Sequence, residues 1–393
     1  MRILLVNDYA TDAGGAELQM LMLRTALRTR GHDVRLFASA AGNPPPTAAD
    51  EYCFGTTSAL RTPLQAVNPF AKARLRRVID DFEPDIVHVR IFLTQLSPLI
   101  LPLLREVPSI LHVSWYRAIC PRGTKLLPDG RDCEHRAGRA CLREGCLSVR
   151  AWTPMMLQFA LLRRHLSVFT RVLTLSESIR LRLVAEGFDT VEVLRNAAEE
   201  RPMRPPLDGP PTVAFAGRLV FEKGADLLVR AIGEVRSAIP DARLLVVGDG
   251  PERPRLEALV RELGLGETVE LTGVLDRDTL EDRLDVAWVQ AMPGRWVEPF
   301  GNAGAEALMR GTALVTTEPG GAAELVRESG GGAVVARGDV FALATALADR
   351  LGDRRLSETE GRNGRAWALD NLRYDDYVSR VERIYREVVA EAA

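Results

Sequence analysis

Short apolar runs alternate with amphipathic stretches along the first half of the chain. Runs rich in valine, isoleucine and leucine predict buried strands at residues 2–6, 34–38, 86–89, 109–113, 172–175 and 191–194. Apolar side chains at helical spacing predict helices over 17–30 and 72–82. Apolar strands separated by helices are typical of a parallel sheet that is covered on both faces. We therefore expect a doubly wound α/β domain over residues 1–200.

The same alternation starts again after a segment rich in proline. Residues 201–211 contain five prolines, which continue neither a helix nor a central strand, so they predict a linker. Beyond it we expect strands at 213–216, 244–247, 269–271, 286–290, 313–316 and 333–335, with helices such as 225–236, 253–263 and 303–310. This predicts a second doubly wound parallel-sheet domain over 212–370, with ligands at the carboxyl ends of the strands in a cleft between the domains. We expect a last helix, over 371–393, to pack back on the first domain.

Composition and charge narrow the class of protein. Of the 393 residues, 46% are hydrophobic and 26% are charged, as in ordinary soluble domains. The net charge of −2 argues against a protein that coats nucleic acid. Residues 1–190 carry 25 Lys/Arg and 18 Asp/Glu, whereas residues 191–393 carry the remaining 26 and 35. The positive first half suggests an anionic partner for that half, and no nucleic-acid partner is expected.

Neither a secretion signal nor a membrane span is recognisable. No apolar run approaches the ~18 residues of a transmembrane helix. The nearest, at 155–162, reads either as a core helix or as a helix resting on a bilayer surface, and short apolar helices are more often internal. We expect a cytoplasmic protein whose membrane contact, if any, is weak and peripheral at the inner face of the membrane.

Two segments of the second domain carry residues suited to a phosphate-containing ligand. In the first, a predicted strand ends at Gly217, and Arg218 and Lys223 follow before the next helix; Lys223 is one of only three lysines in the chain. Two cations beside a helix N-terminus form an anion site, although two solvated surface cations are the alternative. The second segment runs from Glu298 to Glu306, eight residues apart at the start of a helix. Such carboxylates can accept hydrogen bonds from sugar hydroxyls.

These segments occur among further motifs in an order that resembles a known family. The motifs are Gly217-Arg218-x4-Lys223-Gly224, Val247-Gly248-Asp249-Gly250-Pro251, Leu271-Thr272-Gly273, Glu298-Pro299-Phe300-Gly301 with Glu306, and Pro319-Gly320-Gly321-x2-Glu324. Their order is similar to that of retaining family-4 glycosyltransferases of the GT-B fold, which has two Rossmann-like domains. The resemblance is strong over about residues 213–350. It is weaker in the first half, where Gly14-Gly15-Ala16-Glu17, Asp85-Ile86-Val87-His88-Val89 and Ser176-Glu177 carry it.

The resemblance implies a role for each matching residue. Arg218 and Lys223 should grip the diphosphate of a UDP- or GDP-sugar donor and stabilise the leaving group without a catalytic metal, and Gly217 ends the strand before them. Glu306 should bind the ribose, and Glu298 should face the transferred sugar. The remaining donor contacts should come from Gly14 and Gly15, from Phe300, Gly301 and Asn302 at the sugar, and from Thr272, Gly273 and Val274 at the base.

The first domain should then bind the acceptor, and it departs from the family pattern at one position. Many relatives have a His-Asp pair shortly before a Cys-Pro, whereas this chain has Ser114-Trp115 before Cys120-Pro121. His112 would share the face of Ser114 if the strand continues. It either replaces the catalytic histidine of the relatives or is a hydrogen-bonded core histidine.

Four of the five cysteines gather in an insert at about 118–148. They are Cys120, Cys133, Cys141 and Cys146, with His135 among them. Clustered thiols in a cytosolic protein favour a structural zinc site over disulfides, although the cluster lacks close C-x2-C pairs. An iron–sulfur cluster or reduced thiols are the alternatives.

The function predicted from the resemblance is transfer of a sugar, with retention, to a hydroxyl of a natural product, a polysaccharide or a lipid-linked acceptor. A sugar-nucleotide epimerase of the same architecture and an inactive binding homologue remain as alternatives. An NAD-linked oxidoreductase fits less well, because residues 7–15 lack G-x-G-x-x-G.

Overall fold

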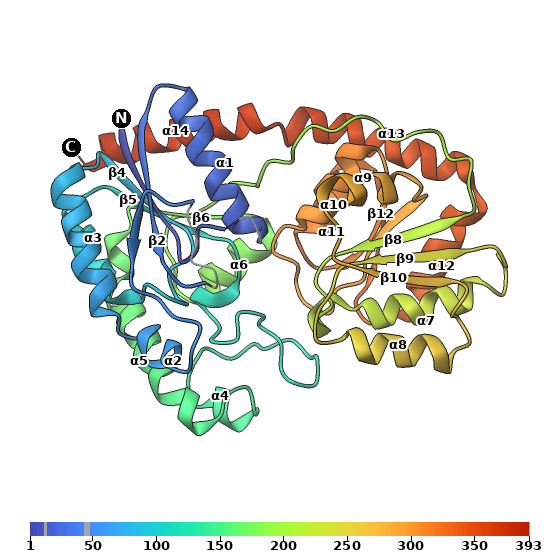
Figure 1. The fold of residues 1–393 in the computed structure, drawn as a ribbon, viewed down its shortest axis with the longest axis horizontal. Helices are drawn as coiled ribbons and strands as arrows, with labels where there is room; N and C mark the ends of the chain where they lie inside the picture. The colour runs from blue at the N-terminus through green and yellow to red at the C-terminus, as the bar shows by residue number, and fades with distance from the viewer. Residues whose placement is uncertain (12–13, 43–47, 393) are drawn as a thin grey trace. The chain divides into compact units, whose positions relative to one another are not determined.

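The computed structural model describes residues 1–11, 14–42 and 48–392. By its internal contacts the chain divides into two compact units. Unit 1 consists of Met1–Arg195 together with the segment from Tyr377 onward, and unit 2 consists of Asn196–Asp376. Each unit contains its own parallel sheet with helices on both faces (Figure 1). The doubly wound α/β class predicted from the alternation of apolar runs is thus confirmed.

The described part of unit 1 contains a seven-stranded sheet in the order β3-β2-β1-β4-β5-β6-β7, with all neighbours parallel. Its strands are β1 (Arg2–Val6), β2 (Asp33–Ser39), β3 (Glu51–Cys53), β4 (Ile86–Val89), β5 (Ser109–Val113), β6 (Arg171–Thr174) and β7 (Val191–Val193). The central strands β1, β4 and β5 are almost entirely buried, because helices cover both faces of the sheet. This explains why they read as continuous apolar runs in the sequence.

Helical segments of unit 1 cover both faces of this sheet (Figure 1). They are α1 (Gly15–Thr29), α2 (Arg61–Leu64), α3 (Pro69–Phe82), η1 (Pro98–Glu106), η2 (Tyr116–Ala118), α4 (Ala140–Arg143), α5 (Val149–His165), η3 (Leu166–Val168), α6 (Glu177–Ala185) and α14 (Tyr374–Ala392). α3 begins where Pro69 follows Asn68, whose side chain accepts a hydrogen bond from the Ala71 N–H.

α14 brings the far end of the chain onto unit 1. Its buried residues recur every three or four positions from Tyr377 to Val388, which gives the helix one continuous apolar stripe. The Tyr385 hydroxyl lies 2.6 Å from Nδ1 of His88 on β4. Glu382 accepts a hydrogen bond from Arg30 at 3.0 Å and lies 2.7 Å from His32 Nε2. These polar contacts fix the position of the helix along the sheet.

Unit 2 has a parallel sheet of six strands in its described residues, in the order β10-β9-β8-β11-β12-β13. The strands are β8 (Thr212–Ala216), β9 (Arg243–Val247), β10 (Val269–Gly273), β11 (Val289–Met292), β12 (Ala313–Glu318) and β13 (Gly332–Ala336). The helical segments are η4 (Phe221–Lys223), α7 (Ala225–Val235), α8 (Arg253–Glu262), α9 (Arg277–Asp285), α10 (Asn302–Arg310), α11 (Gly321–Ser329), α12 (Val340–Gly352) and α13 (Arg354–Asn371).

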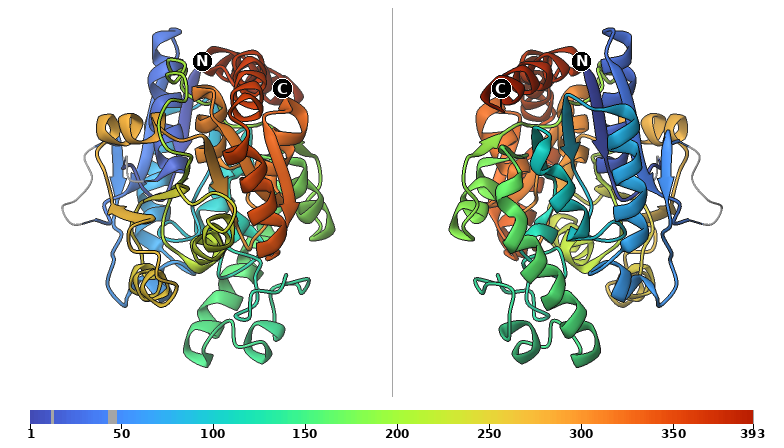
Figure 2. Two further views of the ribbon diagram at one scale, coloured as in Figure 1. Left: turned by 90° about the vertical axis from the view of Figure 1, so that its right-hand side faces the viewer. Right: turned by 90° about the vertical axis from the view of Figure 1, so that its left-hand side faces the viewer.

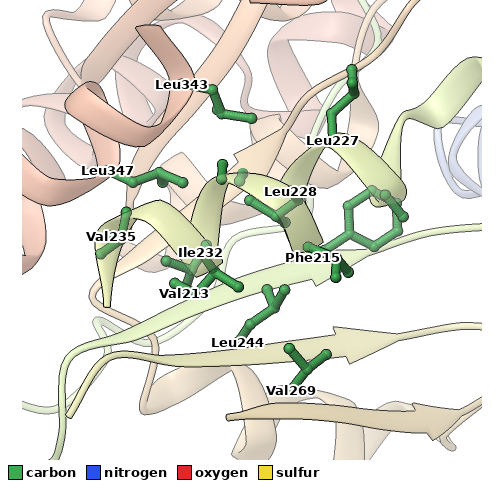
Figure 3. Packing of buried hydrophobic residues seen from close by; sticks show 14 of the residues in the cluster. Val213, Phe215, Leu227, Leu228, Ile232, Val235, Leu244, Val269, Leu343 and Leu347 are labelled. Atoms are coloured by element: carbon green, nitrogen blue, oxygen red, sulfur yellow. The ribbon is translucent and has the colours of Figure 1, made fainter. Parts of the chain in front are cut away.

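The core of unit 2 lies between its sheet and the helices α7 and α12. Leu228 and Ile232 of α7 face Val213 of β8 and Leu244 of β9, and Leu343 and Leu347 of α12 close the cluster from the other side of α7 (Figure 3). All of these side chains are buried. This packing holds the loops that follow β8 and β9 in a fixed place, because each loop joins a core strand to a core helix.

The segment between β5 and α5 projects from the sheet of unit 1 and carries α4 (Figure 2). It is held partly by Lys125, whose Nζ lies 2.7 Å from Glu186 Oε1 and donates to the His135 carbonyl at 2.9 Å. No helix within the described ranges has both the length and the apolar character that crossing a bilayer requires.

Candidate functional site

The carboxyl edge of the unit 2 sheet gathers most of the predicted donor-binding residues. Because all its strands are parallel, the loops that follow them leave the sheet at one edge. Arg218 follows β8, Thr272 lies at the end of β10, and Glu298 follows β11. Gly320, which follows β12, forms a parallel bridge with Glu298. Residues far apart in the sequence therefore meet at this edge.

Lys223, Glu298 and Trp296 form the polar centre of this edge. Lys223 Nζ lies 2.6 Å from Glu298 Oε2, and the indole Nε1 of Trp296 donates to the same oxygen at 3.0 Å. The ammonium also lies 5.2 Å from the centre of the Trp296 ring, within the range of a cation–π contact. The Lys223 side chain is 22% exposed and that of Glu298 is 14% exposed. The ammonium is therefore held in place and remains accessible from solvent.

A second ion pair joins the loop that carries Lys223 to the loop that carries Glu298. Arg295 binds Asp226 through two hydrogen bonds of 2.6 Å each, and its guanidinium also donates to the Phe221 carbonyl at 3.1 Å. Burial tends to raise the pKa of Asp226, but the hydrogen bonds and charge of Arg295 bring that pKa below its usual value. Gly224 has φ 69°, and a Cβ there would lie 2.1 Å from the Pro293 oxygen. The close approach of the two loops thus requires glycine at this position.

Glu306 lies on α10 with its carboxylate unengaged. α10 begins after Gly301, which has φ 92° and leaves no room for a Cβ beside Ala322. Among the described residues, no hydrogen bond or ion pair includes the Glu306 carboxylate, and the residue is partly exposed. Burial raises its pKa, and the charges of Arg201 and Arg310 act in the opposite direction. A partly buried carboxylate without an internal partner is suited to accept hydrogen bonds from a ligand.

The other predicted contacts of unit 2 lie around this centre. Arg218 is exposed, and Asn302 accepts a hydrogen bond from the Asn196 side-chain amide at 3.0 Å. Phe300 is buried.

Gly273, at the end of β10, has φ 79°, and its carbonyl accepts a hydrogen bond from Gly248 N at 2.8 Å. Thr272 also donates to the Gly273 carbonyl, so that carbonyl is already engaged, and Val274, which is 78% exposed, offers an apolar side chain to a ligand at the end of β10.

The predicted residues of unit 1 lie in two different environments. Gly14 and Gly15 begin α1, and a Cβ on Gly14 would clash with the Glu17 carboxylate. Just before them, buried Asp8 accepts hydrogen bonds from the backbone N–H groups of residues 94–96 and from the Thr94 hydroxyl. Burial raises the pKa of Asp8 against the effect of these hydrogen bonds. Asp8 therefore fixes the loop after β4 to the end of β1.

His112 is a core residue, which contradicts its predicted catalytic role. It is fully buried in β5 and stacks on His88 of β4, with ring centroids 5.4 Å apart. Burial, together with the nearby charge of Arg90, lowers the pKa of His88 to about 3 and that of His112 well below its usual value. Ser114, two residues further on, accepts a hydrogen bond from Arg90 Nε at 2.6 Å. His112 is thus a core histidine, as in the alternative interpretation of the sequence, but neither of its ring nitrogens has a hydrogen-bond partner among the described residues, so the hydrogen bonding expected in that interpretation is not found.

This burial predicts how stability depends on pH. The folded-state pKa of His112 lies below the unfolded value of about 6.5. As the pH falls, the unfolded chain therefore binds a proton that the folded chain does not bind, and the folded state becomes less stable. His112→Phe should remove this contribution. When the pH is lowered from 7.5 to 5, the free energy of unfolding of the variant minus that of wild type, measured by urea unfolding, should therefore increase by about 2 kcal/mol. An equal difference at both pH values would contradict the account.

Two family descriptions together match nearly the whole chain. "Glycosyl transferase 4-like domain" matches residues 14–197, and "Glycosyl transferases group 1" matches residues 197–367. The chain belongs to the family-4 glycosyltransferases of the GT-B fold. The order of the two descriptions along this glycosyltransferase agrees with the order of its two sheets, and the second description covers the predicted donor-binding residues from Gly217 to Glu306.

Known relatives agree with this assignment. The glycosyltransferase is 38% identical over 170 residues to the GDP-mannose-dependent alpha-(1-6)-phosphatidylinositol monomannoside mannosyltransferase of Mycolicibacterium smegmatis. That match covers 42% of this chain and 44% of the relative, so it spans less than half the length of either protein. Sucrose-phosphate synthase from Thermosynechococcus elongatus has a similar fold, with a TM-score of 0.76, 22% identity and 99% of each chain covered. HepE from Anabaena, in complex with UDP-glucose, also has a similar fold, with a TM-score of 0.70 at 18% identity, and the match covers 100% of each chain.

The zinc site predicted for the insert is not formed. In the described part of the glycosyltransferase, no group of three or more His, Cys, Asp or Glu side chains is placed to hold a metal ion. Cys120, Cys133, Cys141 and Cys146 are all free thiols. Buried Cys141 packs with Phe159, and Cys146 lies against the same apolar cluster. Burial raises the pKa of the Cys133 and Cys146 thiols.

Sequence reasoning also missed several contributors to the site. Trp296 lies only two residues before Glu298, and an indole beside a predicted sugar-facing carboxylate was a signal that could have found it. Arg295 and Asp226 gave no such signal, because an ion pair across 69 residues is not visible in a pattern. The triplet Asp276-Arg277-Asp278 resembles a metal motif, but Asp276 caps α9 by accepting from Thr279 N at 3.0 Å.

A cavity of about 540 Å³ at unit 2 lies away from this site. It is lined by the proline-rich segment that includes Pro206, by the starts of β8 and β9, and by residues around Thr268 before β10. These positions are at the amino ends of the strands. In open parallel sheets ligands bind at the carboxyl ends, so the chemistry belongs to the opposite edge.

Proposed function

We propose that this chain is a retaining glycosyltransferase that moves a sugar from a UDP- or GDP-sugar to a hydroxyl of an acceptor. The observation that carries the proposal is the Lys223–Glu298 ion pair at the carboxyl edge of the unit 2 sheet. It places a partly exposed cation next to a carboxylate and an indole, in a chain whose family transfers sugars. A diphosphate needs the cation, and a sugar ring suits the other two groups.

In this proposal Lys223 and Arg218 bind the donor diphosphate. Cleavage of the bond between sugar and phosphate increases the negative charge on the leaving group, and preorganised cations stabilise that charge without rearranging. The N-terminus of α7, which follows Lys223 and Gly224 directly, adds a favourable dipole. Catalysis then needs no divalent cation at the diphosphate.

Glu298 has two roles in succession. Without a donor, it neutralises Lys223 and so fixes the ammonium at one place. When a diphosphate binds, Lys223 is shared with the phosphate oxygens, and the carboxylate becomes available to accept hydrogen bonds from hydroxyls of the sugar. The Trp296 indole keeps its hydrogen bond to Glu298 throughout and prevents the carboxylate from swinging away.

Glu306 and the backbone around α10 position the rest of the donor. We assign the unengaged Glu306 carboxylate to the ribose hydroxyls, and the segment from Phe300 to Asn302 to the sugar. Thr272, Gly273 and Val274 at the end of β10 form the base pocket. A donor-binding role for Gly14 and Gly15 of unit 1 rests on the family resemblance alone and stays a prediction. The relatives named above use or bind GDP-mannose and UDP-glucose, which supports a guanine or uracil nucleotide.

The acceptor hydroxyl loses its proton to the departing phosphate on the same face of the sugar, which gives retention of configuration. Among acceptor classes we favour a lipid-linked or otherwise anionic molecule. The excess of positive charge in residues 1–190 supports this choice, as does the phosphatidylinositol monomannoside acceptor of the mycobacterial relative.

Product analysis tests the proposal. Once the donor has been found by binding, incubation with candidate acceptors should release the nucleoside diphosphate and form a glycoside with the anomeric configuration of the donor, as seen by NMR. Inversion would contradict the retaining mechanism. An epimer formed from the donor alone would show an epimerase instead, and donor binding without any product from any acceptor would favour an inactive homologue.

A further inference from the structure

A set of exposed apolar side chains lies along the segment of unit 1 that runs from the end of β3 to the start of α3. It consists of Phe54, Leu60, Val67 and Phe70, which are 49%, 63%, 37% and 56% exposed. Phe54 and Phe70 pack edge to face with ring centroids 5.4 Å apart. We call these four residues the aromatic patch. Exposed apolar groups that gather in this way commonly mark a binding surface.

The core does not need this cluster. The buried residues of α3 are Ala71, Leu75, Val78 and Phe82, which form one stripe facing the unit. Phe70 lies on the other side of the helix and leaves this stripe complete. The position of the patch is also well fixed, since Asn68 caps α3 and donates to the Phe54 carbonyl at 3.2 Å. The two rings are therefore held outward by the fold.

The surroundings of the aromatic patch are strongly positive. Residues 52–79 contain five Lys/Arg and no Asp or Glu. Arg61 and Arg77 are exposed, and no ion pair within the described ranges includes either of them. Arg77 follows Phe70 by seven residues, which places both on one face of α3. Arg74, on the same face, binds Glu51 at 2.6 Å, and Asp80 is the next acidic residue along the chain.

The same character continues on α5. Residues 146–176 contain no Asp or Glu and four arginines, among them Arg150 at the start of α5. Val149 is 73% exposed and Leu157 is 47% exposed. α5 packs against α2, and α3 and α5 both pack on η1, which puts the three helices on one side of the unit 1 sheet (Figure 2). The apolar and cationic surface thus extends over more than one element.

We propose that the aromatic patch, with Arg61 and Arg77, docks unit 1 on the surface of an anionic lipid bilayer. Apolar side chains entering the headgroup region and unpaired cations beside them are what interfacial binding requires. Leu60 and Val67 favour a bilayer over nucleic acid, because aliphatic side chains do not stack on bases as aromatic rings do. Phe54 and Phe70 also direct ring edges at each other instead of offering parallel faces. The proposal goes beyond sugar transfer and stands without it.

The test measures binding of the full chain to vesicles by sedimentation at physiological salt. Wild type should bind vesicles of phosphatidylcholine mixed with phosphatidylglycerol, and much less those of phosphatidylcholine alone. Phe54→Ser/Phe70→Ser should weaken the partition coefficient about tenfold, because the apolar anchor is lost. Arg61→Glu/Arg77→Glu should weaken it at least tenfold. Each cation near an anionic surface adds to the electrostatic attraction, and replacing it by a carboxylate loses about twice the attraction that simple removal would lose.

Matched controls come from unit 2. Phe341 is 79% exposed, and Arg261 and Arg355 are exposed without ion pairs in the described part of the chain. Phe341→Ser and Arg261→Glu/Arg355→Glu should leave vesicle binding unchanged. All variants should keep the thermal unfolding and nucleotide binding of wild type, which separates failure of this proposal from failure of the proposed function.

Three results would overturn the proposal. One is absence of binding by wild type to the anionic vesicles. Another is binding that depends on the arginines but is unaffected by Phe54→Ser/Phe70→Ser, which would be electrostatic adsorption without apolar contact. The third is tighter binding to duplex DNA than to anionic vesicles under the same conditions, with the DNA displacing them, which would assign the surface to nucleic acid.

Discussion

Replacing Lys223 by alanine is expected to lower turnover at saturating donor by about a hundredfold or more. Loss of one preorganised donor at a site of developing charge raises a barrier by about 3 kcal/mol. The loss is increased by Glu298, which pairs with Lys223 at 2.6 Å and would remain near the diphosphate without its counter-ion. The measurement is the initial rate of nucleoside diphosphate release at saturating donor and acceptor.

Two further variants make this result specific. Lys72→Ala removes another of the three lysines, one in unit 1 with no ion pair among the described residues, and should leave the rate unchanged. Lys223→Ala/Glu298→Gln should bind the free nucleoside diphosphate, which carries no sugar, more tightly than Lys223→Ala does, because the uncompensated carboxylate is gone. A rate for Lys223→Ala within threefold of wild type would remove Lys223 from the diphosphate site.

Glu306→Ala should weaken the binding of the free nucleoside diphosphate by about 10- to 100-fold, since a hydrogen bond to a charged group contributes about 1.5–3 kcal/mol. The Glu306 carboxylate has no hydrogen-bond or ion-pair partner in the described ranges, so its removal deprives no other side chain of a partner. The expected loss therefore reports on the ligand and not on a damaged fold. Isothermal titration calorimetry measures it directly.

A modified ligand provides the control for Glu306. If the carboxylate binds the ribose, wild type should lose affinity for the 2′-deoxy nucleoside diphosphate, and Glu306→Ala should discriminate much less between the two ligands. Equal affinity of Glu306→Ala and wild type for the ribonucleotide would contradict the ribose assignment.

The sheets were largely predictable from the sequence, because buried parallel strands leave continuous apolar runs. β1, β4 and β5 have the predicted bounds. β11 runs over Val289–Met292 instead of 286–290, because Val286 still has helical backbone at the end of α9. β3 was missed because it is a three-residue edge strand with a single buried side chain, Cys53.

The donor site was predictable as a set of residues but not as a set of contacts. Motif order named Lys223 and Glu298, yet their ion pair joins positions 75 residues apart. The role of Trp296 as a hydrogen-bond donor to Glu298 depends on how two loops approach each other. That approach rests on Gly224 and on the Arg295–Asp226 pair, and neither contact leaves a periodic signal.

The two mistaken predictions have a common cause, which is that residue type does not reveal burial. His112 was considered as a catalytic group because of its spacing from Ser114, but it is fully buried in β5 between the neighbouring strands β4 and β6. The insert cysteines were grouped by sequence distance, whereas Cys141 packs as an apolar side chain. Polar contacts such as Lys125–Glu186 hold the insert in place of the predicted metal.

Calorimetric titration of the full chain with UDP-, GDP-, ADP- and dTDP-sugars shows whether the carboxyl edge of the unit 2 sheet binds a sugar nucleotide. We expect saturable binding of at least one of these sugar nucleotides, competition by the corresponding free diphosphate, and clear weakening of both in Lys223→Ala. Absence of saturable binding by every member of the panel, with a chain shown to be folded, would contradict the assignment of the unit 2 edge as a sugar-nucleotide site.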